Sequence, residues 1–536
     1  NNANITDPTS QSTTITCETP AAAVGTYRTV VKTWGGTTPD TPSDDYTYET
    51  PYIPPDQLTP TNTWVKAADS NTAAINSITG TSATNFTVDL DANMIPIVNK
   101  ADDDTHPSRW CNYDEKQWCN AVTLNNTTQK YDTNGNTGTL TPLAYYKDYA
   151  PAGTIIAEED ILGYWTYIPR YKYQVTRYDA NNDNTNYRTP TPFNIQFQKA
   201  TDAKAIPTAY TGTGDYQTNV GADNAWATHP AFTFAGEQLN GLWVGKFETT
   251  GSTVAPTIKP NLKSQISQAI GVQYDISKSI GVIDGNATGG NGTIVTQNFH
   301  NLSQAKTHQL KNSDWGAVAY LSSSIYGAGP NNVQANGAYK TDLQDGNGNT
   351  GNGITGCGPD ANGTTNQYTI TDTATTGAVA CTYGGVSHSY QTNTGVLASS
   401  TNNVYGIYDL SGGAWDYVMG NYATSFTANM GTMPNADYFN NYPSSIFTGN
   451  HTTNNNKCTW ATCGGHALHE TKTVQAVSDG AQSWGADYSN FVLAASPWFA
   501  RGGHLANGTL TGVFASSYND GSPNAVIGFR VVLGEF

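Results

Sequence analysis

The close spacing of the cysteines is the feature that most constrains how this chain folds. Six of its seven cysteines form three pairs of near neighbours: Cys111 with Cys119, Cys357 with Cys381, and Cys458 with Cys463. As a disulfide, each pair would close a short loop, which favours a loop-rich protein of an oxidising compartment. Spacing does not prove the connectivity. Cys17 is left over, and it forms either a bridge to another chain or a free buried thiol.

Composition excludes several classes of partner. The net charge is −17, yet only 12% of the 536 residues are charged, and Asn, Thr, Ser and 53 Gly supply most of the polarity. A phosphate backbone demands clustered Lys and Arg, so nucleic acid is not an expected partner. No run approaches the roughly 20 apolar residues that span a bilayer, so we expect no membrane span. The chain starts at Asn1 instead of Met, which indicates removal of a targeting segment or propeptide.

The N-terminal part of the chain differs from the rest in its residue pattern. Residues 12–17 and 27–34 have the β-branched content and alternation of strands, and the prolines that follow up to residue 60 indicate an extended linker. Residues 85–91 and 94–98 are predicted strands around a turn. We therefore divide the chain into an N-terminal strand region with a Pro-rich linker (1–60), a small β-rich domain (61–154) and a C-terminal domain (155–536).

A series of motif segments marks the C-terminal domain. Residues 311–321 are predicted to form a helix, because Trp315, Val318 and Ala319 recur at helical spacing. Three further segments follow in order: the glycine-rich residues 403–418, then Arg501-Gly502-Gly503, and finally residues 528–533.

These last three segments resemble the signature of the formylglycine-generating-enzyme-like (sulfatase-modifying factor type) branch of the C-type-lectin fold. The resemblance runs from about residue 155 to residue 536, and it implies an α+β domain that is mostly β and irregular with few helices. It also implies that residues 164–173 and 241–248 are the first strands of this domain. Enzymes of this family bind copper through a cysteine pair shortly after the Arg-Gly-Gly element. Residues 504–536 contain no cysteine, and Ser or Asn cannot replace a thiolate in metal binding or redox chemistry. We therefore expect no catalytic residues and no enzymatic activity.

The segment in the place of that cysteine pair, residues 504–527, resembles the variable region of retroelement-diversified C-type-lectin-fold proteins. In a binding surface, Tyr provides rigid contact area, whereas Ser, Asn and Gly adapt their hydrogen bonds. An ordinary surface loop explains the same composition. The resemblance implies a ligand-binding face with these contact residues: His504, Phe514, Tyr518, Asn519, Asp520 and Asn524.

Two segments have the pattern of a calcium site, because they place oxygen ligands at alternate positions. The candidates are Asp179, Asn181 and Asp183 in the first segment and Asp345, Asn347 and Asn349 in the second. Asx turns in ordinary loops explain both segments more simply. A zinc site built from Cys458, Cys463, His466 and His469 is conceivable, but a disulfide is the simpler explanation of its cysteines. No other cofactor is expected.

Together these features predict an extracellular adhesin, displayed on a cell or virion surface as a subunit of a pilus-like filament. We expect residues 1–34 to add a donor strand to an adjacent subunit's open sheet edge; alternatively, this strand belongs to its own N-terminal sheet. The ligand would be a protein or a glycan, and Asn-x-Ser/Thr sequons such as Asn286 make the chain a candidate glycoprotein. A virion receptor-binding tail protein is the alternative function, followed by a formylglycine-type oxidase.

Overall fold

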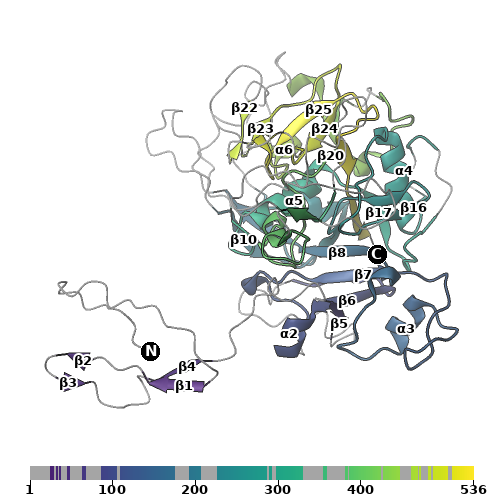
Figure 1. Ribbon diagram of the computed structural model, residues 1–536. Coiled ribbons are helices and arrows are strands. Elements are labelled where there is room, and N and C mark those ends of the chain that lie inside the picture. Colours follow the sequence, from purple (N-terminus) through teal and green to yellow (C-terminus); the bar gives the residue numbers. More distant parts are fainter. Residues whose placement is uncertain are drawn as a thin grey trace.

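The structure is a computed structural model, and two β-sheets with helices around them form its main body (Figure 1). It describes residues 25–28, 32–33, 36–37, 45–48, 63–67, 86–105, 109–175, 192–206, 226–285, 289–292, 297–329, 354–358, 381–383, 386–423, 427–446, 460–468, 470–471, 481–484, 487–504, 507 and 510–535. Within these residues the chain is mostly β with few helices, as predicted. None of the described helices has the length and apolar character that crossing a bilayer requires.

The first sheet has seven strands in the order β17-β27-β14-β8-β7-β6-β5. They are β5 (Trp64–Lys66), β6 (Met94–Asn99), β7 (Asn120–Leu124), β8 (Ile161–Pro169), β14 (Gly241–Gly245), β17 (Lys306–Gln309) and β27 (Val531–Glu535). Neighbouring strands are antiparallel throughout. The boundary that we placed near residue 155 falls between β7 and β8, which are direct neighbours in this sheet.

β8 lies at the centre of this sheet because its sequence suits a strand that is covered on both faces. Aromatic and β-branched residues dominate it, and Trp165, Tyr167 and Ile168 are all fully buried. The ring of Tyr167 lies 5.0 Å from that of Trp243 on the adjacent β14. Large aromatic side chains of this kind supply most of the buried apolar area of the core.

The second sheet has the order β21-β20-β24-β25-β23-β22, and β26 also pairs with β20. Its strands are β20 (Trp415–Tyr422), β21 (Asn440–Tyr442), β22 (Ala481–Gln482), β23 (Tyr488–Ser489), β24 (Trp498–Arg501), β25 (Ser516–Asn519) and β26 (Ile527–Phe529). Successive side chains of a strand point to opposite faces. Val418 and Phe499 therefore join the main core, whereas Tyr417 and Trp498 join a second apolar cluster on the other face.

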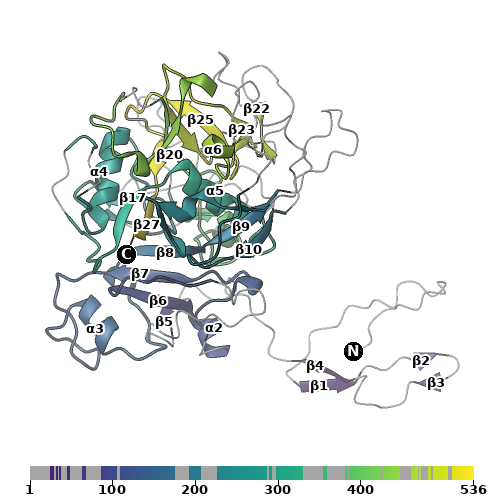
Figure 2. The ribbon, with the colours of Figure 1, turned by 180° about the vertical axis from the view of Figure 1, so that it is seen from behind.

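The end of the chain joins the two sheets. β26 pairs with β20 in the second sheet, and after the single residue Arg530 the chain enters β27 of the first sheet. In Figure 1 the first sheet lies below the second, and α5 lies between them in both views (Figures 1 and 2). The side chain of Arg530 is consequently placed at the junction of the two layers.

Smaller sheets surround this body. The three-stranded sheet β10-β9-β11 contains β9 (Tyr171–Gln174), β10 (Asn194–Phe197) and β11 (Ala227–Thr228). The two-stranded pairs are β1 (Gly25–Arg28) with β4 (Asp45–Tyr48), β2 (Lys32–Thr33) with β3 (Gly36–Thr37), β12 (Thr233–Phe234) with β13 (Glu237–Gln238), β15 (Thr250–Ser252) with β16 (Ala255–Thr257), and β18 (Thr382–Tyr383) with β19 (Val386–Ser387).

The helices are short. The α-helices are α2 (Lys100–Thr105), α3 (Pro142–Asp148), α4 (Ile270–Ile280), α5 (Asn312–Ser322) and α6 (Trp460–Cys463). The 3-10 helices are η2 (Tyr113–Glu115), η3 (Glu158–Asp160), η6 (Pro230–Phe232), η8 (Gly395–Ala398), η9 (Ala436–Tyr438) and η10 (Ser444–Ile446).

Helix α5 is buried on all sides. Asp314 begins it by accepting the Lys311 N–H at 2.9 Å, and every residue of the helix is buried. At Gly316 the backbone of Gly465 comes so close that an added Cβ would lie 1.7 Å from its carbonyl oxygen. Only glycine fits at this point of the helix. The predicted helix over residues 311–321 is confirmed.

The predicted strands at residues 94–98, 164–173 and 241–248 are confirmed by β6, by β8 with β9, and by β14. The strand predicted over residues 85–91 is wrong, because its described part joins no strand pair. Phe86 and Val88 are buried as alternation requires, 2% and 1% exposed. The carbonyl of Asp89, however, accepts a hydrogen bond from Trp243 Nε1 at 2.6 Å. The Asp89 carbonyl is therefore bonded to a side chain of the sheet and not to the backbone of a neighbouring strand.

At the N-terminus, β1 pairs with β4 of the same chain. Residues 25–28 thus belong to an N-terminal sheet of their own chain, which was the alternative to a donor strand. The other predicted strand, residues 12–17, lies outside the described residues, as does Cys17. The pair β1 and β4 lies apart from the main body in both views (Figures 1 and 2).

Two of the three predicted disulfides are present. Cys111 is bonded to Cys119 and Cys357 to Cys381. Cys463 is disulfide-bonded as well, but its predicted partner Cys458 lies outside the described residues. Both complete bridges are buried among aromatic or polar side chains of the core.

We expect the Cys357→Ser/Cys381→Ser double variant to lose about 3 kcal/mol of unfolding free energy, because the bridge closes a loop with a sequence separation of 24 residues. Denaturant titration followed by tryptophan fluorescence measures the loss. The control is Cys111→Ser/Cys119→Ser, whose loop has a separation of 8 residues; loop-closure entropy predicts a smaller loss. Equal losses, or none from the first variant, would contradict the expectation.

Candidate ligand-binding face

Arg501, the last residue of β24, is the centre of a buried hydrogen-bond network. Its side chain is fully buried, and Nε donates to the carbonyl of Ala515 at 2.9 Å. Nη1 donates to Asn312 Oδ1 at 3.0 Å and to the carbonyl of His466 at 2.9 Å, and Nη2 donates to the carbonyl of Ala467 at 2.9 Å. Burial lowers the pKa of Arg501 to about 10, so the guanidinium stays charged at neutral pH. It fixes the residue that leads into β25.

Arg530 forms a second buried network between the sheets. Its Nε donates to Asp416 Oδ2 of β20 at 3.2 Å, and Nη1 donates to the carbonyl of Gly245 on β14 at 3.1 Å. Burial raises the pKa of Asp416 to about 6, although Arg530 opposes the shift. Burial, followed by the nearby charges of Asp416 and Asp409, raises the pKa of Glu248 well above its usual value. Arg530 thus compensates only part of the negative charge of three buried carboxyl groups, Asp416, Asp409 and Glu248.

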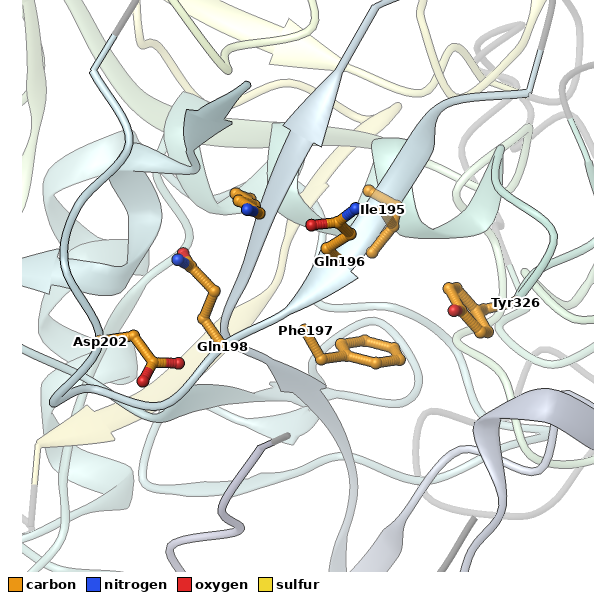
Figure 3. A pocket seen from close by; sticks show the side chains of 7 residues that line it. Ile195, Gln196, Phe197, Gln198, Asp202 and Tyr326 are labelled. Carbon is orange, nitrogen blue, oxygen red and sulfur yellow. The ribbon is translucent and has the colours of Figure 1, made fainter. Parts of the chain in front are cut away.

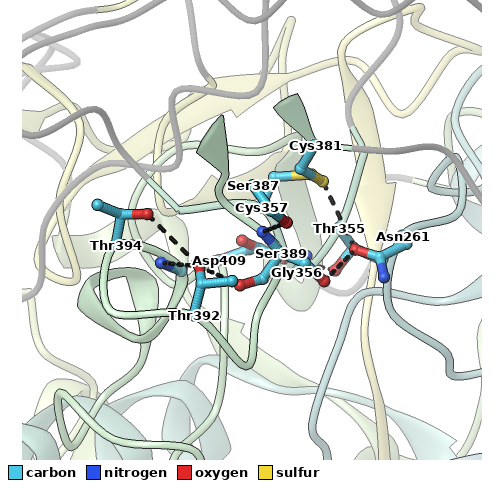
Figure 4. The surroundings of a disulfide bond; sticks show 11 residues. Asn261, Thr355, Gly356, Cys357, Cys381, Ser387, Ser389, Thr392, Thr394 and Asp409 are labelled. Carbon is cyan, nitrogen blue, oxygen red and sulfur yellow. Dashed lines mark hydrogen bonds between the residues drawn. A yellow bond between two sulfur atoms is a disulfide. The ribbon is translucent and has the colours of Figure 1, made fainter. Parts of the chain in front are cut away.

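The Cys357–Cys381 disulfide lies against this acidic group (Figure 4). The carboxylate of Asp409 accepts the Gly356 N–H at 2.7 Å and the Thr355 hydroxyl at 2.5 Å. The bridge therefore anchors the residues that satisfy a buried carboxylate. Removing the disulfide would break the covalent link and weaken these two hydrogen bonds.

Three of the predicted contact residues, Tyr518, Asn519 and Asp520, lie at the end of β25. β25 pairs with β24 along its length and with β23 at Ser516. Tyr518 is partly buried and packs against the main core. Asn519 accepts a hydrogen bond from the Tyr417 hydroxyl, and Asp520 is exposed at the tip that follows.

His504 and Asn524 flank this tip in the sequence. His504 is partly buried, its N–H donates to Asn507 Oδ1 at 3.0 Å, and burial lowers the pKa of its imidazole to about 4. It is therefore neutral at physiological pH. Asn524 accepts the Val526 N–H through its side chain at 3.0 Å, which fixes the turn before β26.

Phe514 does not belong to this surface. Its ring is 1% exposed and lies 5.7 Å from the ring of Trp484 and 6.4 Å from that of Phe193. A side chain buried in this way cannot contact a ligand in this conformation, so our assignment of Phe514 as a contact residue is corrected to a core role. The structure places Tyr518, Asn519 and Asp520 in one continuous stretch.

The calcium candidates Asp179, Asn181, Asp183, Asp345, Asn347 and Asn349 all lie outside the described residues. Among the residues that the structure describes, no group of three or more His, Cys, Asp or Glu side chains is arranged to hold a metal ion. The zinc alternative is wrong, because Cys463 is disulfide-bonded and provides no thiolate.

A groove lies along strand β10 (Figure 3). It is a groove of about 380 Å³, lined by Lys172, Ile195, Gln196, Phe197, Gln198, Asp202 and Tyr326. None of these residues was predicted from the sequence to belong to a binding site. The alternation of polar and apolar residues over 194–197 was the available signal, but it indicates only a strand.

Comparison with protein-family models and with curated proteins finds no match to this chain.

Two buried histidines lie beside the Arg501 network. Burial, and then the charge of Arg501, lower the pKa of His466 to about 3. Burial and the neighbouring His466 do the same to His229. Both imidazoles are therefore neutral in the folded chain at any pH above about 4, whereas in the unfolded chain they take up protons below about pH 6.5.

This difference predicts a loss of stability with acid. The native state binds fewer protons than the unfolded state between pH 6.5 and 3, so each histidine lowers the unfolding free energy by up to about 1.4 kcal/mol per pH unit as the pH falls. His466→Asn should destabilise the chain at pH 7, and its deficit relative to the parent should narrow towards pH 4. Denaturant titrations across this range measure the deficit.

The matched control is Tyr442→Phe, which removes the hydroxyl that contacts His466 Nδ1 at 2.7 Å but keeps the imidazole. Its deficit should stay nearly constant with pH. If the deficit of His466→Asn also stayed constant, His466 would not titrate as a buried neutral group.

Proposed function

We propose that this chain is an extracellular, non-enzymatic ligand-binding protein, a subunit of a surface filament, built on a formylglycine-generating-enzyme-like C-type-lectin domain. The observation that carries the proposal is the placement of the partly exposed Tyr518 and Asn519 at the end of β25, which is paired with β24, and of the exposed Asp520 directly after it. A preorganised strand loses little conformational entropy when it binds, and Tyr supplies rigid contact area. The surface suits recognition of a protein or a glycan.

The arrangement of the motif segments supports the family assignment. Asp416, from the glycine-rich motif, faces Arg501 of the Arg-Gly-Gly motif in the β20–β24 pair. On the other side of β20, the same Asp416 faces Gly528 of the last motif. The three motif segments, which are far apart in the sequence, are thus neighbours in one sheet, as expected if together they form one family signature.

The sequence between β24 and the chain end supports a binding role over an oxidase role. Residues 504–536 contain no cysteine, so thiol-dependent copper chemistry has no ligand there. The place of the cysteine pair is taken by the residues that lead to Tyr518 and Asp520.

Assembly into a filament is supported by the N-terminal strands. β1 and β4 form a two-stranded sheet, and a sheet of two strands is marginally stable on its own in water. Pairing with an edge strand of another copy would stabilise it by β-augmentation. We therefore propose residues 1–34, with the adjoining strand β4, as the self-association surface.

The ligand-binding proposal is tested with Tyr518→Ser/Asp520→Ala. We expect binding of the labelled protein to intact cells of its own and co-occurring species to fall at least about tenfold, while the melting temperature falls by only a few degrees, because both side chains are partly or fully exposed. The control is Val254→Ser, an exposed site (62%) in the turn between β15 and β16. Unchanged cell binding by the double variant would place the ligand site elsewhere.

The assembly proposal is tested with two truncations, lacking residues 1–20 or residues 1–48. If residues 1–20 donate the strand, both truncations should be monomeric by light scattering and should form no filaments by electron microscopy. If the pair β1 and β4 makes the contact, only the longer truncation should lose assembly. Filaments formed by both would rule out an N-terminal contact.

A further inference from the structure

We propose that the groove along β10 binds a neutral carbohydrate, at a site separate from the face at the end of β25. The groove lies on the sheet β10-β9-β11, whereas β25 belongs to the second large sheet. Its lining residues all lie in the part of the chain that the structure describes and belong neither to β25 nor to the N-terminal strands, so the site is independent of filament assembly and of Tyr518.

The size of the groove limits its occupant to one small molecule. Its volume of about 380 Å³ lies near the lower end of the roughly 300–1,000 Å³ of small-molecule sites. Four consecutive lining residues, Ile195 to Gln198, come from β10 and the position after it. The groove therefore follows the length of the strand.

The polar residues of the groove offer both donors and acceptors. Lys172 carries three N–H donors, the amides of Gln196 and Gln198 provide donors and acceptors, and Asp202 provides acceptors. A sugar hydroxyl donates one hydrogen bond and accepts others, so it needs such a mixed set. With one cation and one anion among the lining residues, the groove favours a ligand without net charge.

Several of these groups are held in place. Gln198 accepts the Thr228 hydroxyl at 2.9 Å, and Asp202 Oδ2 accepts the Lys199 N–H at 2.8 Å. The ammonium of Lys172 lies 5.2 Å from the ring centre of Trp226. Gln196 is different: its amide is exposed and makes no hydrogen bond with any other described residue.

Aromatic rings provide the apolar part of the groove. The rings of Phe197 and Tyr326 lie 4.8 Å apart, and Phe197 is backed by Phe86 at 5.0 Å and Tyr113 at 5.4 Å. Figure 3 shows Phe197 and Tyr326 on one side and Gln198 with Asp202 on the other. A pyranose has the matching character, with apolar C–H groups on its faces and hydroxyl groups at its edge.

The test uses the full chain and a panel of neutral monosaccharides and disaccharides, with binding measured by saturation-transfer NMR and calorimetry. We expect at least one sugar to bind with a millimolar Kd. Gln196→Ala should weaken this binding at least about tenfold, the equivalent of 1.4 kcal/mol. Trp226 lies beside Lys172, so its fluorescence should change on binding.

The matched control is Asn194→Ala, which is exposed on the same face of β10 but outside the groove, and whose amide donates to Gln174 Oε1 at 3.0 Å. It should bind the sugar like the parent chain. Failure of every sugar to bind, or equal affinity in Gln196→Ala, would overturn the proposal. Preferential binding of acetate, phosphate or free lysine, or of an extended peptide along β10, would overturn it as well.

A last comparison separates this site from the proposed binding face. Tyr518→Ser/Asp520→Ala should keep full sugar affinity if the sugar occupies the groove. If that variant lost sugar binding while Gln196→Ala kept it, the face at β25 would be the carbohydrate site and the groove proposal would be wrong.

Discussion

The structure depends on the buried contact of Arg530 with Asp416 and the carbonyl of Gly245, because the chain changes sheets at this residue. β26 belongs to the second sheet and β27 to the first, so the Arg530 side chain contacts both layers, as does Gln309 of β17, whose Nε2 donates to the carbonyl of Tyr417 on β20 at 2.9 Å. Removing one partner of a buried ion pair costs about 3–5 kcal/mol, a large share of the 5–15 kcal/mol that stabilises a typical domain. The relative position of the two sheets therefore depends on a few polar atoms.

Two other buried basic side chains, Lys246 and Arg501, stabilise irregular segments by donating hydrogen bonds. Lys246 donates to Asn120 Oδ1 and to the carbonyls of Val404 and Gly406, at 2.6–2.8 Å, and Arg501 donates mainly to carbonyls. Carbonyls in buried loops lack the partners that strands and helices provide, and leaving them unpaired is costly. In a chain with only 12% charged residues, basic side chains at these points provide the hydrogen-bond donors that neighbouring backbone provides in helices and strands.

Rigid support links this frame to the two proposed binding sites. The residues at the end of β25 follow a strand that is fixed by pairing with β24, and Ala515, just before it, is bound by Arg501. The groove along β10 has a floor of packed aromatic rings. In both places a few exposed side chains stand on a buried layer, so exposed substitutions can alter recognition with little effect on stability.

The sequence by itself indicated strand β6, helix α5 and two disulfides, because residue patterns and short cysteine spacing involve near neighbours in the chain, and the resemblance of the motif segments indicated β8 and β14. It also indicated the alternation around Phe86, but Trp243 from a distant strand decided that this segment joins no sheet. Tertiary packing against Trp484 and Phe193 decided that Phe514 is buried. The β10 groove exists only because Tyr326 and Lys172, distant in sequence, meet there, and no local pattern carries that information.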